Sequence, residues 1–221
     1  MAQSPPPSPP SPPSPPPSSP PPGLMENLAG VIDIMLGRAS GKSRMDLSAG
    51  GIGWSFAGLA LAGLIDISAL SMLYNGQVGT SSPPVSKGFF IFGHLTVALI
   101  AYLASFIALF LLCRMPQEQK NFPAAIAIHN WVAPIVSLAF LPLLFIGFAM
   151  GGRSGPAEEN TLLNLISVFW IVVLIFIGIR LIRLSLELQT GKAIVFFVVT
   201  TAVSLVTKEG LESLIGLTAQ P

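Results

Sequence analysis

The chain has 221 residues, of which 52% are hydrophobic and only 10% are charged, with a formal net charge of +1. Its mean hydropathy is +0.73. A soluble domain is typically about 25% charged, so this composition excludes an ordinary water-soluble enzyme. The small net charge also excludes the basic surface that nucleic acids require. The composition therefore predicts an all-α membrane protein with several spans.

Residues that could carry metal or covalent chemistry are few. Cys113 is the only cysteine, which excludes an intramolecular disulfide and a cysteine-cluster metal site. No group of His, Asp or Glu has the spacing of metal ligands, and no serine has the setting of a hydrolase nucleophile. We therefore expect a protein that is not an enzyme and holds no cofactor or metal.

The chain starts with a proline-rich segment. Residues 4–22 consist only of serine and proline, with 13 prolines. Proline fixes φ and lacks an N–H group, so residues 1–24 are predicted to be disordered or in the polyproline II conformation. The segment lacks the basic and apolar regions of a secretory signal peptide. It is a solvated tail, a ligand for a proline-recognising domain, or the result of a start assigned upstream of the real one, Met25.

Residues 25–50 are predicted to hold an amphipathic helix and a basic juxtamembrane linker. The helix covers residues 24–37, where apolar residues recur at helical spacing and Glu26 and Asp33 are polar. Arg38, Lys42 and Arg44 follow, where anionic lipid headgroups would attract them. The helix either lies along the membrane as a lead-in to the first span or docks a partner.

The segment from Gly37 to Ser43 is similar to a phosphate-binding loop but is one residue too short. A P-loop needs glycine, four residues and then Gly-Lys-Ser/Thr, and Leu36 stands where the first glycine should be. No β-strand pattern precedes the segment. We therefore expect no nucleotide binding and interpret the segment as a basic, flexible linker.

Five apolar segments are long enough, or nearly long enough, to cross a bilayer, which takes about 20 residues in a helix. They form a membrane domain over residues 51–217, with spans at 51–73, 88–112, 124–150, 161–182 and 193–207. The fifth is short and would need a thinned bilayer or neighbouring helices. Gly58 and Ala62 in the first span, and Gly147 and Gly151 in the third, have small-xxx-small spacing, which favours close packing inside the bundle or a dimer face.

The distribution of basic residues predicts that the N-terminus lies in the cytoplasm and the C-terminus outside. Cytoplasmic loops carry an excess of Lys and Arg. With the N-terminus inside, the outer side holds only Lys87, Arg153 and Lys208. The inner side then holds eight basic residues: Arg38, Lys42, Arg44, Arg114, Lys120, Arg180, Arg183 and Lys192.

Asp66 and His94 are the predicted intramembrane polar pair. Helical rise places Asp66 about 10 Å and His94 about 9 Å from the same outer boundary, on consecutive antiparallel spans. Ionisable residues within spans are costly, and histidine titrates near neutral pH. The pair is therefore interpreted either as a proton- or cation-handling centre or as a structural contact between the first two spans.

A second group of polar residues is predicted near the inner face. His129 and Asn130 lie about 8 Å inside the third span by helical rise, where they could bind a headgroup or a partner or hydrogen-bond across helices. Arg180 and Arg183 close the fourth span as positive-inside anchors. Arg183 and Glu187 are spaced i,i+4 and are predicted to pair on one helix.

Five spans, a cytoplasmic N-terminal region, short loops and an outward C-terminus resemble the Ypt-interacting-protein (Yip) domain family and small multi-span inner-membrane proteins of bacteria. The resemblance covers residues 45–217 at the level of topology. Eukaryotic Yip proteins carry an Asp-Leu-Tyr-Gly-Pro motif, of which this chain has only Asp46 and Leu47, followed by Ser48. The resemblance therefore implies a fold and no site residue.

These observations predict a non-catalytic multi-pass protein that acts as a scaffold or accessory subunit, in the inner membrane of a bacterium. Its expected partners are the lipid bilayer and other membrane-protein subunits or copies of itself, with no nucleic acid and no nucleotide. The alternative function is a transporter or channel component that uses Asp66 and His94 as an ionisable centre.

Overall fold

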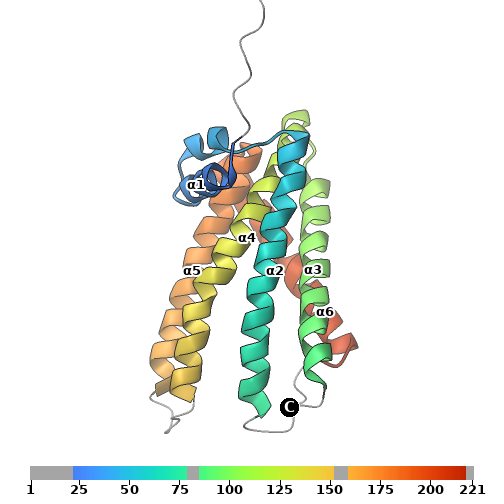
Figure 1. Ribbon diagram of the computed structural model, residues 1–221. Helices are drawn as coiled ribbons and strands as arrows, with labels where there is room; N and C mark the ends of the chain where they lie inside the picture. Colours follow the sequence, from blue (N-terminus) through green and yellow to red (C-terminus); the bar gives the residue numbers. More distant parts are fainter. Residues whose placement is uncertain (1–21, 79–84, 152–158, 218–221) are drawn as a thin grey trace, which may run out of the picture.

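The computed structural model describes residues 22–78, 85–151 and 159–217, and every regular element in these ranges is helical (Figure 1). The all-α prediction is therefore confirmed for this part of the chain. Most of the proline-rich segment, residues 1–21, lies outside the described residues. The helices are α1 (Leu24–Met35), the short 3-10 helix η1 (Ala39–Arg44), α2 (Ala49–Val78), α3 (Lys87–Leu112), α4 (Pro116–Gly151), α5 (Glu159–Leu186) and α6 (Thr190–Leu214).

Five of these helices are long and apolar enough to cross a membrane, as predicted: α2 to α6. Four of them, α2, α4, α5 and α6, are several residues longer than expected, and α4 and α6 differ most. Helix α4 begins at Pro116 because proline at the first helical position loses no hydrogen bond. Helix α6 has 25 residues, so the predicted short fifth span is the apolar part of a full-length helix that continues through the polar residues Lys208 and Glu209.

The five long helices run alternately up and down, so the described chain begins and ends at opposite ends of the bundle (Figure 1). Helix α4 is central: it packs extensively against α2 and also against α5, whereas α3 packs mainly against α6. Helices α2 and α3 are consecutive in the chain but share a much smaller interface. Helices therefore have neighbours that chain order does not indicate.

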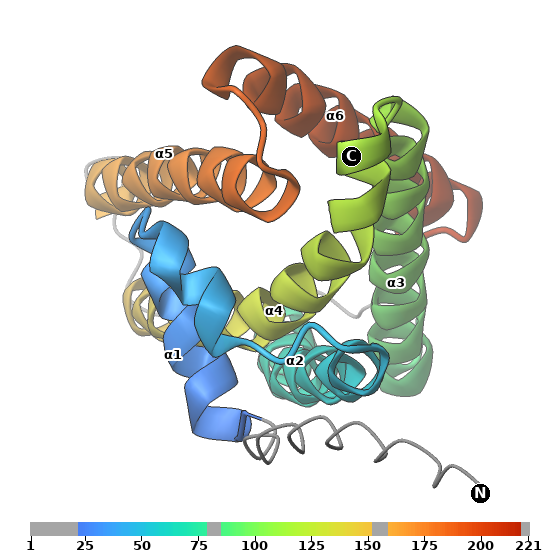
Figure 2. The ribbon, with the colours of Figure 1, turned by 90° about the horizontal axis from the view of Figure 1, so that it is seen from above.

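Helix α1 lies across one end of the bundle, roughly perpendicular to the long helices (Figures 1 and 2). We call α1 and η1 together, residues 24–44, the N-terminal platform. Val31 and Ile34 are fully buried in a core cluster with Ile128 and Trp131 of α4 and Leu181 of α5. Burying an aliphatic side chain of this size contributes about 1.5–3 kcal/mol, so these contacts hold α1 on the bundle.

Two close backbone contacts depend on glycine. Within the N-terminal platform, a Cβ at Gly30 would lie 2.7 Å from the carbonyl oxygen of Gly41, and a Cβ at Gly41 would overlap the carbonyl of Gly30. Between α2 and α4, a Cβ at Gly58 would lie 2.7 Å from the carbonyl oxygen of Asn130. Gly58 and Ala62 are both buried, which supports packing inside the bundle. Of the other small-residue pair, Gly147 and Gly151, the side-chain surroundings lie outside the description.

Candidate functional site

Asp66 of α2 is half-buried within a membrane-spanning helix. It lines a cavity of about 640 Å³ between α2, α3 and α4. Ser137 of α4 lines the same cavity as Asp66. Asp66 thus faces a cavity to which α2, α3 and α4 all contribute, and whose lining residues Phe56, Leu64 and Leu99 are exposed.

His94 of α3 has a different set of neighbours. Its Nδ1 lies 2.8 Å from the carbonyl oxygen of Phe90, and because a carbonyl only accepts, this nitrogen carries the proton. Its Nε2 lies 3.9 Å from Glu212 of α6, and Lys208 is equally far from the same carboxylate oxygen. The structure therefore places His94 against α6, whereas Asp66 lines a cavity shared by α2, α3 and α4, and no ion pair joins the two.

Asn130 is the centre of a buried hydrogen-bond network that joins three helices. Its side-chain oxygen accepts from the Tyr102 hydroxyl of α3 at 2.5 Å, and its amide donates to the Ser55 hydroxyl of α2 at 2.8 Å. Asn130 and Ser55 are both fully buried. A buried amide with both ends satisfied stabilises one arrangement of helices.

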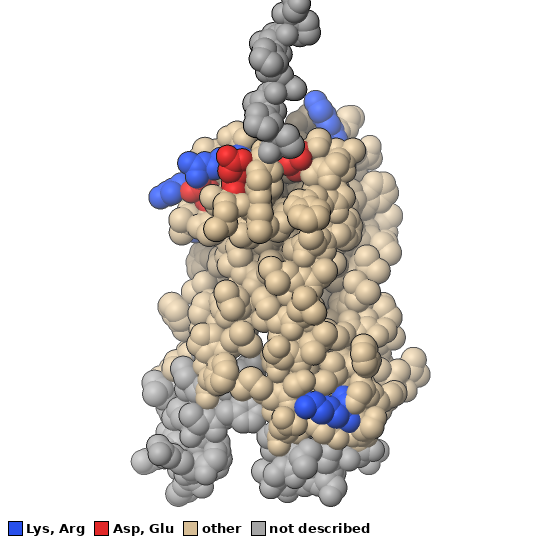
Figure 3. All heavy atoms as spheres, viewed as in Figure 1, with Lys and Arg blue, Asp and Glu red and all other residues tan. Residues whose placement is uncertain are grey.

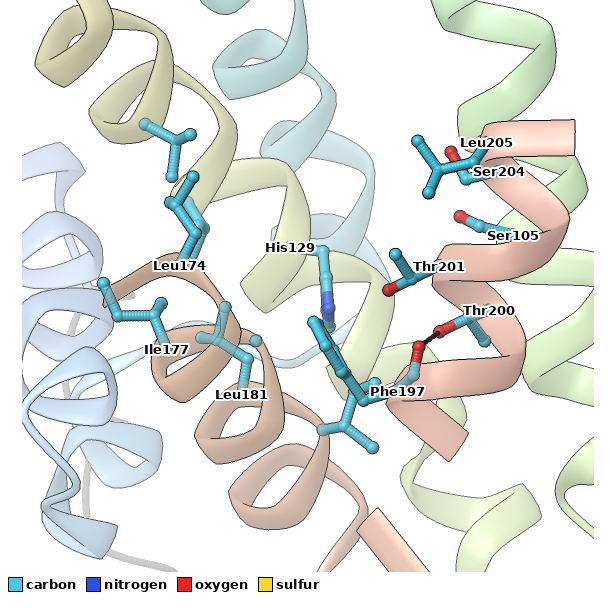
Figure 4. A pocket seen from close by; sticks show the side chains of 14 residues that line it. Ser105, His129, Leu174, Ile177, Leu181, Phe197, Thr200, Thr201, Ser204 and Leu205 are labelled. Atoms are coloured by element: carbon cyan, nitrogen blue, oxygen red, sulfur yellow. Dashed lines mark hydrogen bonds between the residues drawn. The ribbon is translucent and has the colours of Figure 1, made fainter. Parts of the chain in front are cut away.

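His129 points the other way, into a cavity of about 300 Å³ between α3, α4, α5 and α6. Its Nδ1 donates to the carbonyl of Ala125 at 2.8 Å, which leaves Nε2 as an acceptor. Figure 4 shows the hydroxyl side chains of Ser105, Thr201 and Ser204 around the same space, opposite aliphatic side chains of α5. This cavity is therefore polar on the side of α3, α4 and α6.

Arg180 belongs to neither group. It is exposed on α5, and its guanidinium donates to the carbonyl oxygen of Met35 at the end of α1, at 3.3 Å. The structure thus separates the predicted inner-face cluster: Asn130 faces α2 and α3, His129 faces the second cavity, and Arg180 contacts the N-terminal platform. Adjacent positions on a helix diverge by about 100°, so His129 and Asn130 face different neighbours.

The N-terminal platform contains a carboxylate that the sequence places on the polar face of α1. Asp33 is buried, with ion pairs to Arg38 at 2.9 Å and Arg44 at 3.2 Å. Two of the basic residues predicted to face lipid headgroups are therefore paired with a buried carboxylate, while their own side chains remain exposed. The apolar residues Ile32 and Leu36, in contrast, are exposed.

Lys42 connects the N-terminal platform to the C-terminal end of α5. Its ammonium group lies 2.7 Å from Glu187 and 3.2 Å from the carbonyl oxygen of Ser185, and Gln117 of α4 donates to Glu187 at 3.0 Å. These hydrogen bonds lower the pKa of Glu187 below its ordinary value. Residues 39–44 are thus a helical turn joined to the bundle, where a flexible linker was expected.

The predicted pair of Arg183 and Glu187 does not form. Helix α5 ends at Leu186, and Glu187 has φ of +58°, so the helical spacing does not extend to it. Arg183 instead donates to the Thr190 hydroxyl at 3.4 Å. The turn after Leu186 directs Glu187 toward Lys42.

A further ion pair joins α4 and α6 and has no counterpart in the sequence motifs. Glu118 is buried and hydrogen-bonds to Lys192, and its other oxygen accepts from the backbone N–H groups of Arg114 and Met115. Burial, followed by the charge of Glu118, raises the pKa of the nearby Cys113 thiol to about 11. Single charges beside an apolar segment indicate where a span ends, but they do not indicate which charges form ion pairs.

On the face drawn in Figure 3, charged residues gather at the end of the bundle that carries the N-terminal platform, with one further basic group near the opposite end and a broad uncharged belt between them. The belt exposes large apolar side chains, including Phe92 and Val206, which are 70% and 72% exposed. No family model, curated protein or solved structure matches the chain. Five helices of this length and hydropathy are compatible with a multi-pass integral membrane protein.

Proposed function

We propose that the protein is a non-catalytic scaffold or accessory subunit of a complex in the bacterial inner membrane, and that the N-terminal platform is its partner-binding surface. The observation that carries this proposal is that the N-terminal platform is fastened to the bundle at several separate points. Lys42 bonds to Glu187 after α5, Arg180 of α5 bonds to the end of α1, and Val31 and Ile34 fill the core beneath the platform.

A helix fixed in this way presents the same side chains at all times, so a partner loses little entropy in ordering it. The outward side combines exposed apolar groups with arginines: Met25, Ile32, Leu36, Arg38 and Arg44. Arginine and large apolar residues are enriched at the centres of protein interfaces. This composition supports a protein partner at the membrane surface.

The platform end is proposed to be cytoplasmic. Basic residues are concentrated there, in and near the platform and at the adjoining helix ends, while Lys87 and Lys208 lie toward the other end. The positive-inside rule then places the N-terminus inside and the C-terminus outside. The topological resemblance to the Yip domain family stands beside this proposal and is compatible with it.

The proposal is tested by purifying the tagged protein in a mild detergent and identifying the chains that copurify. We expect a stoichiometric partner with the wild type and its loss with Gly41→Ala, because the added Cβ displaces η1 from α1. Gly53→Ala is the matched control, since nothing lies within 4 Å of a Cβ at that position. Equal recovery of the partner with both variants, or no partner with the wild type, contradicts the proposal.

The second candidate function is a transporter or channel component, which the carboxylate of Asp66 favours because it lines an open cavity inside the spans. In this version Asp66 acts without His94, whose nearest acid is Glu212. The test is a flux measurement in liposomes with Asp66→Asn. Loss of flux in a correctly assembled variant supports a transport function, and unchanged flux excludes a role of Asp66 in transport.

A further inference from the structure

The cavity between α2, α3 and α4 combines apolar walls with one acidic group. Its volume of about 640 Å³ lies within the range of sites that hold a drug-sized molecule. The walls are aliphatic and aromatic, with Phe56 and Leu59 from α2 and Leu99 and Tyr102 from α3. The carboxyl group of Asp66 is the only carboxyl group among the lining residues in the described part of the chain.

This carboxylate has no basic partner in the described part of the chain. The ion pairs there involve Asp33, Glu118, Glu187 and Glu212, and none involves Asp66. Within residues 22–78, 85–151 and 159–217, no Lys, Arg or His lines the cavity. A charged group within a span is costly unless an opposite charge or a proton compensates it. The site is therefore complementary to a positive charge brought from outside.

The surroundings select the kind of cation. A metal ion such as Ca²⁺ needs six to eight oxygen ligands, whereas the side-chain oxygens here come from Asp66, Ser137 and Tyr102. The Tyr102 hydroxyl is already used by Asn130. Aromatic rings and aliphatic walls instead suit an organic cation, whose charge an aromatic face also attracts.

We propose that this cavity is a binding site for a lipophilic organic cation, with Asp66 as its counter-ion and the α2 and α3 walls holding its apolar body. The proposal is independent of the N-terminal platform and of any partner protein. It also stands without transport, because a bound cation need not cross the membrane.

The test measures equilibrium binding of tetraphenylphosphonium to the full-length protein in phosphatidylcholine nanodiscs, with protein-free nanodiscs as the background. Tetraphenylborate is the matched probe, since it has the same shape and the opposite charge. We expect saturable binding of the cation and none of the anion. Saturable binding of both probes, or of neither, overturns the proposal.

Two variants test separately the charge of Asp66 and the volume of the cavity. Asp66→Asn should weaken binding of the cation at least about tenfold, the scale of one lost charge-assisted contact. Ala98→Phe keeps the carboxylate but fills the cavity from α3, and should abolish binding. Glu212→Gln removes a carboxylate outside the cavity and should leave affinity unchanged within twofold. Undiminished binding by both Asp66→Asn and Ala98→Phe overturns the assignment.

A basic helix of another membrane protein is the rival occupant. Photo-crosslinking from position 98 in native membranes distinguishes the two. A crosslinked polypeptide that tetraphenylphosphonium does not displace would overturn the small-cation assignment, whereas the absence of such a band agrees with it.

Discussion

Some buried polar side chains at the platform half of the bundle are satisfied by a neighbour on another helix. Asn130 is the central example, because its amide is hydrogen-bonded at both ends to side chains of α2 and α3. Interhelical hydrogen bonds of this kind average about 0.6 kcal/mol in membranes, so the network supplies specificity more than bulk stability.

Tyr102→Phe removes the hydroxyl donor and leaves the oxygen of Asn130 buried without it. We expect a loss of about 1 kcal/mol in the free energy of unfolding, measured by thermal or denaturant unfolding in detergent. Ser105→Ala is the control one turn away, since that hydroxyl donates only to the carbonyl of Tyr102 on its own helix. Equal losses in the two variants would show that the cross-helix bond adds nothing.

Lys42 and Glu187 make the contact between the N-terminal platform and α5 dependent on pH. Because the pKa of Glu187 is lowered in the fold, its stabilisation is present above the unfolded value of about 4.3 and is lost as the pH falls through the folded pKa. The Glu187 side chain is 51% exposed, so the contribution is below about 1 kcal/mol.

We therefore expect wild type to melt at a slightly higher temperature than Glu187→Gln at pH 7, and the difference to shrink as the pH falls below about 4.3. The comparison cancels the titration of every other carboxyl group, which both proteins share. A difference that stays constant from pH 7 to pH 3 would exclude the ionised pair as its cause.

Contacts between elements depend on backbone approach as much as on apolar area. Helices α2 and α4 come so close at Gly58 that any side chain would meet the backbone of Asn130. Small residues are common at such crossings in membranes, because they allow closer packing of backbones.

Gly58→Ala is expected to destabilise the bundle by about 1–3 kcal/mol, the usual cost of overpacking. Gly63→Ala, one turn further along α2, meets nothing within 4 Å and should be neutral or slightly stabilising, since alanine favours the helix. Unfolding in detergent measures both. The same sign of change in the two variants would contradict the close approach.

Helix boundaries show why some elements were predictable and others were not. The five apolar segments were found because hydropathy is a local property, and their central parts lie in α2 to α6. The extra length of α4 and α6 was missed because polar residues at a span boundary do not end a helix. Likewise, the inward position of Asp33 depends on Arg38 and Arg44, which a helical pattern alone does not bring together.

At the scale of the whole molecule, the sequence predicted the number of long helices but not their neighbours. Asp66 and His94 were paired on the assumption that consecutive spans pack together, whereas α2 packs mainly on α4 and α3 on α6. The glycine-rich segment before the first span was compared with a P-loop, and its Gly41 instead packs against Gly30. In both cases the neighbours of a residue depend on packing between separate elements, which a single sequence does not display.

The molecule consists of a bundle of five long helices and the N-terminal platform, which is fixed across the basic end of the bundle. Several charged residues at that end form ion pairs within the fold, Arg38 among them. The apolar side chain of Leu36, two residues before Arg38, is 58% exposed. The central claim is that this surface binds another protein and does not simply rest on lipid headgroups.

The most direct test is site-specific photo-crosslinking in living cells from position 36, with the lipid-facing position 92 on α3 as the control. The account predicts a discrete crosslinked polypeptide from position 36, absent from position 92 and lost when Gly41→Ala is added. Crosslinks from position 36 to lipid alone would contradict it and would leave α1 as an interfacial helix without a partner.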